Sequence, residues 1–139
     1  LKTDILSKTE EILGYVSKIE TISAETIKEY REKLYNRVRE VVSTMVEIDE
    51  TRILTEVAIY TDKTCVDEEI VRLKSHVEAV RGMMESGGAV GKKLDFIIQE
   101  MNREINTIGS KANELKIAEI VIEVKTIIEK IREQIQNME

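Results

Sequence analysis

Apolar residues recur every three or four positions along most of the chain, the spacing that places them on one face of an α-helix. This pattern predicts an all-α fold of about six amphipathic helices with short connections. The first helix has an apolar stripe that consists of Ile5, Ile12, Val16 and Ile19. A second helix is expected over about 23–47, with Ser23 as its N-cap and a stripe of Ile27, Leu34, Val38, Val41 and Met45.

Two aspartates mark the next helix starts. Asp49 is expected to cap a third helix, and Asp67 a fourth, whose acidic first turn complements the helix dipole. The fourth helix is expected to stop at Ser86-Gly87-Gly88, and Gly91 extends this turn signal. The stripes are Ile53, Val57 and Tyr60 in the third helix and Ile70, Leu73, Val77, Val80 and Met84 in the fourth.

The last two predicted helices have regular patterns. The fifth ends near Gly109, and the sixth has a stripe wide enough to need burial on two sides. The stripe of the fifth comprises Leu94, Ile98, Met101, Ile105 and Ile108, and that of the sixth comprises Ile117, Ile120, Val121, Val124, Ile127, Ile128, Ile131 and Ile135. We expect the six helices to form an elongated bundle that oligomerises through its wide apolar stripes.

Composition narrows the fold class further. The 139 residues include no Pro and only six Gly, so the turn residues that an all-β fold needs are missing. No run of 18 apolar residues is present, so no transmembrane helix is predicted. The 21 basic and 27 acidic residues give a net charge of −6. Cys65 is the only cysteine and cannot form an internal disulfide, which fits a reducing cytoplasm.

The fifth predicted helix has an unusual polar composition. Asn102 and Asn106 are poor helix formers that fill no core position, so their cost in helix propensity points to function. At 100° per residue they lie with Asp95 and Gln99 along one flank of the apolar stripe. The alternative is a neutral helix contact between subunits.

Two glutamates lie on the opposite flank of the same helix. Glu100 and Glu104 are one turn apart on this flank, which also includes Lys93. Their carboxylates are close enough to share a divalent cation. On spacing alone, the competing interpretation is a solvated acidic edge paired with Lys93 or Arg103.

The only histidine, His76, lies on the fourth predicted helix. Histidine side chains serve in proteins as proton carriers and as metal ligands, so His76 could transfer a proton in phosphodiester cleavage or coordinate a metal. A half-buried packing residue is the alternative. Arg72 lies one turn earlier, where its planar guanidinium could hold a phosphate or serve as a surface ion-pair partner.

The segment 87–93 places three glycines before Lys92 and Lys93 at a helix start, where free N–H groups can hold a phosphate. The glycine spacing and the lack of Ser or Thr after the lysines do not match a P-loop. A plain turn between helices is the simpler interpretation. A regulator that binds a nucleotide at this segment is a further hypothesis.

These residues together resemble the C-terminal region of the YicC/YloC-type endoribonucleases, from about Glu68 to Glu139. The matching stretches are Glu68-Glu69, Arg72-Leu73-Lys74-Ser75-His76, Gly87-Gly88, Gly91-Lys92-Lys93-Leu94-Asp95-Phe96, the run from Gln99 to Ala112, and the run from Glu129 to Asn137. One departure is Lys92, which stands where the family usually has Arg, so a bidentate phosphate contact there is replaced by a point charge.

The resemblance implies a domain organisation and an activity. Residues 65–139 would be the C-terminal RNase-type domain, 1–64 a helical linker and assembly region, and the family's N-terminal α/β domain would precede Leu1. The implied protein is a cytoplasmic endoribonuclease that uses a divalent metal, Mn²⁺ or Mg²⁺, and acts on single-stranded regions of RNA. It would assemble with copies of itself into a ring, expected to be a hexamer.

The resemblance also implies roles for individual residues. Glu100 and Glu104, with Asp95, would hold the metal, and His76 would transfer a proton or act as a further ligand. The expected RNA contacts are Arg72, Lys92, Lys93, Asn102, Arg103, Asn106 and Lys111. Four of these cations lie in the segment 87–111, the only block that is not acidic, with four basic and three acidic residues. The competing hypothesis is a non-catalytic helical module for oligomerisation or RNA binding in a stress-related bacterial protein.

Overall fold

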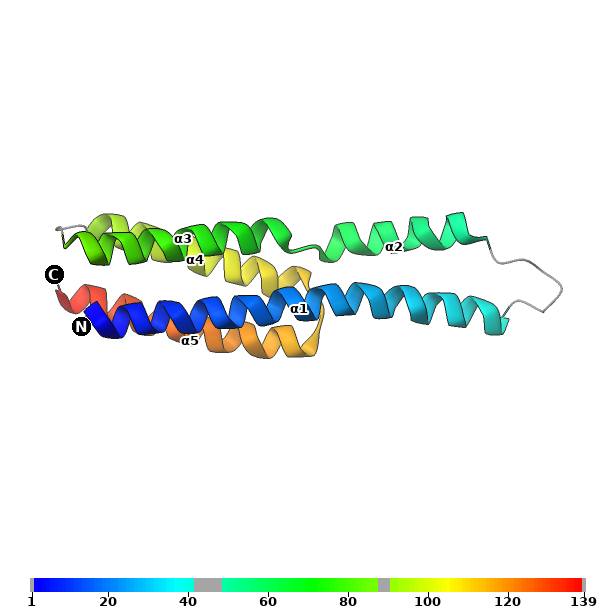
Figure 1. Cartoon of the computed structure of the whole chain (residues 1–139), viewed down its shortest axis with the longest axis horizontal. Helices are drawn as coiled ribbons and strands as arrows, with labels where there is room; N and C mark the ends of the chain where they lie inside the picture. The colour runs from blue at the N-terminus through cyan, green and yellow to red at the C-terminus, as the bar shows by residue number, and fades with distance from the viewer. Residues whose placement is uncertain (1, 42–48, 88–90, 139) are drawn as a thin grey trace.

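The computed structural model describes residues 2–41, 49–87 and 91–138, and every element in these ranges is an α-helix (Figure 1). The elements are α1 (Lys2–Val41), α2 (Glu50–Thr64), α3 (Asp67–Ser86), α4 (Gly91–Lys111) and α5 (Leu115–Met138). The predicted all-α class is confirmed. The expected number of about six helices is wrong for the described part of the chain, which has five.

The difference lies at Ser23, which does not cap a helix. Residues 2–41 form one uninterrupted helix, and Ser23 is inside it. No Gly or Pro occurs between residues 15 and 41, so nothing breaks the backbone pattern. The neighbouring Thr26 hydroxyl donates to the Ile22 carbonyl at 2.8 Å, so this polar group is satisfied within the helix. Met45 of the predicted second stripe lies outside the described residues.

The other predicted helix ends are largely confirmed. The Asp49 carboxylate accepts a hydrogen bond from the Arg52 backbone N–H at 3.2 Å and caps α2. Gly87 ends α3 in the left-handed conformation, with φ of 69°. At the start of α3 the N-cap is Val66, so Asp67 is the first helical residue rather than the cap. Gly91 begins α4 instead of extending the turn.

The first half of α1 packs with α3, α4 and α5 as a four-helix bundle in which neighbouring helices are antiparallel (Figure 1). Each helix contributes its predicted stripe to one core, and α5 contacts both α4 and α1, as its wide stripe requires. Fully buried side chains of this core include Ile5, Ile12, Ile19, Leu73, Ile98, Met101, Ile105, Ile108, Ile117, Ile128, Ile131 and Ile135. Ion pairs of Glu10 with Arg81 and of Glu20 with Lys74 join α1 to α3.

Residues 22–41 of α1 and α2 form a two-helix arm that extends beyond the bundle (Figure 1). Tyr30 and Tyr60 stack across it with ring centroids 3.9 Å apart. Ile53 is the only described arm residue that is buried, because two helices cannot surround each other's apolar stripes. Within the described ranges, no helix is long and apolar enough to cross a membrane.

Candidate active site

Three side chains converge at the junction of α3 and α4. His76 of α3 and Glu100 and Glu104 of α4 each offer one ligand atom, and these atoms lie within 4.8 Å of one another. His76 and Glu100 are half-buried, whereas Glu104 is buried, with 6% of its surface exposed. The structure therefore brings together the three residues that the sequence predicts as catalytic.

Helical periodicity explains this convergence. Each of the three residues directly precedes a buried core residue, and the pairs are His76–Val77, Glu100–Met101 and Glu104–Ile105. A residue next to the core stripe lies at the edge of the helix face that packs. Because α3 and α4 pack against each other, these edges meet at their junction.

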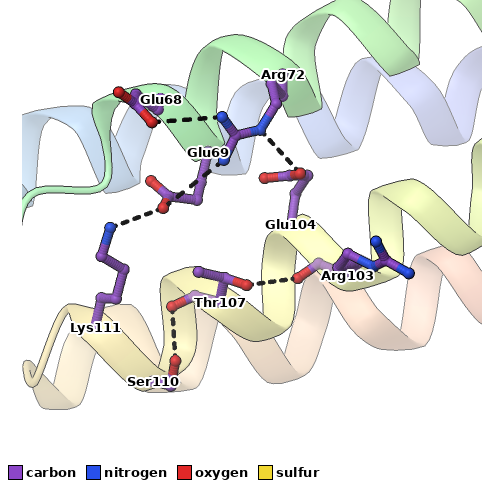
Figure 2. Close-up of polar contacts among 8 residues, drawn as sticks. All are labelled: Glu68, Glu69, Arg72, Arg103, Glu104, Thr107, Ser110 and Lys111. Carbon is purple, nitrogen blue, oxygen red and sulfur yellow. Dashed lines mark hydrogen bonds and ion pairs between the residues drawn. The ribbon is translucent and has the colours of Figure 1, made fainter.

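Arg72 fixes one oxygen of Glu104. Its Nε donates a hydrogen bond to Glu104 Oε1 at 3.0 Å, while its terminal nitrogens lie 3.5 Å from Glu68 Oε2 and 3.9 Å from Glu69 Oε1 (Figure 2). The hydrogen bond to Glu104 is the main cause that raises the pKa of Arg72. Of the two interpretations left open for Arg72, the ion-pair partner is the one that the structure shows.

A second pair joins the same two helices, one turn earlier on α3 and about two turns later on α4. Lys111 Nζ donates to Glu69 Oε1 at 2.8 Å, and only 4% of Glu69 is exposed (Figure 2). Burial alone would raise the pKa of Glu69, but the Lys111 hydrogen bond, its own backbone N–H and the adjacent cations together lower it. The hydrogen bond to Glu69 raises the pKa of Lys111. Lys111, predicted to contact RNA, is thus engaged by an acid.

Glu69 is the residue that the sequence analysis missed as part of the site. From the sequence it is only a position that matches the family and an acid two residues after Asp67. The signal that finds it is its spacing, since Glu69, Arg72 and His76 follow at i, i+3 and i+7 on one helix flank. Its partner on α4 could not be found in the same way.

Asp95 is not part of this group. Its Oδ1 lies 4.0 Å from Arg132 Nε, on the side of α4 that faces α5. The flank that the sequence predicts for Asp95 is therefore the observed one, and it is opposite to the flank of Glu100 and Glu104. The geometry gives no support to Asp95 as a ligand that joins these two glutamates.

The remaining predicted RNA contacts lie on the outside of α4. Lys92 and Lys93 are exposed in its first turn, and Asn106 is exposed near its end, while Asn102 is half-buried. The Arg103 side chain is 74% exposed, and its guanidinium lies 3.8 Å from Glu100 Oε1. The glycine segment between α3 and α4 includes residues 88–90, which lie outside the described ranges, so the phosphate-loop hypothesis stays a prediction.

Comparison with known proteins places this helical architecture in a family. Residues 19–139 match the family model described as "Endoribonuclease YicC-like, C-terminal". The chain belongs to the YicC-like endoribonuclease family. The matched range includes α2 to α5 and therefore every residue of the α3–α4 site. The resemblance stated from the sequence is confirmed.

Two curated relatives of this YicC-like chain have the same name, "Probable endoribonuclease YicC". The protein of Clostridioides difficile (strain 630) is 46% identical over 139 residues, which are 100% of this chain and 47% of the relative. The protein of Haemophilus influenzae (strain ATCC 51907 / DSM 11121 / KW20 / Rd) is 35% identical over 135 residues, 97% of this chain and 46% of the relative. The chain spans about half the length of the curated relatives it matches.

Proposed function

We propose that this YicC-like chain contains the metal-dependent RNA-cleaving site of an endoribonuclease and that His76, Glu100 and Glu104 hold a divalent cation. The observation that supports the proposal is the approach of their ligand atoms to within 4.8 Å of one another. Carboxylate oxygens suit Mg²⁺ and Mn²⁺, and an added imidazole nitrogen favours the transition metal.

The charges of the site fit a cation that meets a phosphate. Two carboxylates and the Arg72 guanidinium sum to −1 when His76 is neutral, and a divalent ion changes this sum to +1. A positive site of this kind binds a phosphodiester, whereas the two carboxylates alone would repel it. When bound, the cation would polarise a phosphoryl oxygen and lower the pKa of a water molecule.

The chain's own residues have distinct tasks in this proposal. Arg72 holds Oε1 of Glu104 and so orients the carboxylate that would bind the cation. His76 transfers a proton or supplies a ligand nitrogen. These two roles are separable by measurement: His76→Gln retains Mn²⁺ binding if His76 is a proton carrier and loses it if His76 is a ligand.

The exposed cations of α4 support an RNA substrate. Lys92, Lys93 and Arg103 lie on the same helix as the two glutamates, within a chain whose overall net charge is −6. Contacts of such side chains with the phosphate backbone weaken as the salt concentration rises. From the family resemblance we also propose that the protein is cytoplasmic and assembles into a ring-like hexamer.

The deciding experiment is cleavage of end-labelled single-stranded RNA with EDTA, Mg²⁺ or Mn²⁺. We expect internal cuts only with metal, and a loss of at least a hundredfold in Glu100→Gln/Glu104→Gln. The matched control is Glu129→Gln/Glu133→Gln, which removes two exposed acids at the same spacing on α5 and should cut normally. Equal cutting by both double variants would contradict the proposal.

The alternative is an assembly module without catalysis, and the arm supports it. Its predicted stripe residues Ile27, Leu34 and Val38 are only half-buried, so they could pack against a second copy. Assembly is expected under both hypotheses and does not separate them. Metal-dependent cutting that Glu100→Gln/Glu104→Gln abolishes without loss of assembly favours the enzyme.

A further inference from the structure

The outward surface of α4 combines cations, amide side chains and one aromatic ring. We call it the outer α4 face: its residues are Lys92, Phe96, Gln99, Arg103, Asn106 and Ser110. They follow one another at spacings of four and three, so they fall within a sector of about 80°, and all six are exposed. None is acidic. The nearest acids, Asp95 and Glu100, lie on its two flanks, where they face Arg132 and Arg103.

Phe96 is the unusual member of this face. It is the only phenylalanine of the chain and is 62% exposed, although Phe belongs to the residue types that are most often buried. Phe96 is not among the residues that form the core of the bundle. Lys92 lies one turn before it, Glu100 one turn after it and Arg103 two turns after it, so the neighbours of Phe96 along this side of α4 are charged.

The position of Phe96 relative to the candidate active site is defined by the helix. Phe96 precedes Glu100 by four residues, which is about 6 Å along the helix axis, and the two side chains lie on neighbouring sectors. Arg103 lies within 3.8 Å of Glu100 and is part of the same surface. A strand that extends along the outer α4 face therefore passes beside Glu100, one of the three predicted catalytic residues.

We propose that Phe96 is a stacking platform for a base of single-stranded RNA and that the outer α4 face positions the strand for cutting. Aromatic rings among cations are how proteins hold single strands, because every unpaired base exposes a π-face. A duplex offers no such face, so the inference names a physical source of single-strand preference. It rests on the proposed function for its link to cleavage, but stacking itself is measurable without cleavage.

Charge favours RNA over a second copy of the chain as the occupant. The face is cationic and free of acids, so two identical faces would repel each other in a symmetric contact. A polyanion with aromatic bases complements both its cations and its ring. A protein partner on this face is the competing possibility, and the experiment must be able to detect it.

The test uses Phe96→Trp, because the chain contains no Trp and the substitution introduces a single fluorophore. In EDTA, which prevents metal-dependent cutting, a single-stranded oligoribonucleotide should quench this fluorescence, and a duplex of the same sequence should quench it much less. The matched control is Ile122→Trp, whose site on α5 is 64% exposed. Equal quenching of the two variants, or no quenching while a labelled strand still binds, would overturn the inference.

A fluorescence change that depends on protein concentration without RNA would also overturn it, because it would show that Phe96 faces another copy. In cleavage assays, Phe96→Leu should raise KM about tenfold, and Phe96→Tyr should restore most of the affinity. If the chain cuts RNA and Phe96→Leu leaves KM unchanged, stacking fails while the proposed function stands. If the chain makes no cuts, quenching of Phe96→Trp still supports stacking.

Discussion

Glu104 combines burial with a negative charge, and this combination needs a compensating partner. Only 6% of the residue is exposed, and a buried carboxylate is costly unless it is paired. Arg72 supplies the partner from the neighbouring helix at 3.0 Å. The same contact that stabilises the carboxylate also sets its orientation, as residues behind metal ligands commonly do.

This arrangement leads to a prediction for Arg72. Arg72→Gln should weaken Mn²⁺ binding by about tenfold or more, because Glu104 loses the donor that orients it. The measurement is a titration with Mn²⁺ followed by electron paramagnetic resonance. Arg132→Gln on α5, which removes the ion pairs with Asp95 and Glu129 and none with Glu100 or Glu104, is the control. Identical Mn²⁺ affinities of the two variants would show that Arg72 does not position Glu104.

Glu69 allows a prediction about pH. Its pKa in the folded chain is below the ordinary value of 4.5, so the carboxylate stabilises the fold above that pH. The contribution decreases as the pH falls through the folded pKa. In Glu69→Gln the free energy of unfolding should therefore be lower than in the original chain at pH 7, and the difference should shrink in acid. Urea unfolding at several pH values measures it, and a difference that grows in acid would contradict the assignment.

At the scale of the helices, the sequence predicts which face of a helix is buried better than it predicts which residues of two helices pair. The stripes of α3, α4 and α5 were predicted because a core face repeats every three or four residues. The flanks of Asp95 and of Glu100 and Glu104 follow from the same geometry. The Lys111–Glu69 pair could not be predicted, because it depends on how far one antiparallel helix is shifted along the other. The prediction that a helix starts at Ser23 is wrong because a residue suited to capping does not by itself interrupt a helix.

The glycines inside helices allow a test of how closely the helices pack around them. A Cβ added at Gly14 or Gly82 would meet nothing within 4 Å, so alanine at either position should raise the free energy of unfolding by about 0.5–1 kcal/mol. At Gly109 the added Cβ would lie 3.2 Å from Val121 Cγ1, between α4 and α5. Gly109→Ala should therefore gain less or lose stability. Denaturant unfolding of the three variants checks this order, and an equal gain at all three would refute the close approach.

The whole molecule has an uneven distribution of packing. The bundle end contains the buried core and the candidate active site, and the arm has one buried residue among those described, Ile53. The chain is acidic overall, yet an acid-free face of α4 lies beside the site. Proposed RNA contact and proposed assembly are thus assigned to opposite ends of one elongated molecule.

The continuity of α1 has a mechanical consequence. Its 40 residues form a rod of about 60 Å. Four of its side chains, from Ile5 to Ile19, are anchored in the bundle, and the remainder is half of the arm. Any torque that a neighbour applies to the far end is delivered as a tilt of the anchored half, which contacts α3 through Glu10 and Glu20. The position of α3, the helix that supplies His76, would thereby depend on how the far end of α1 is held.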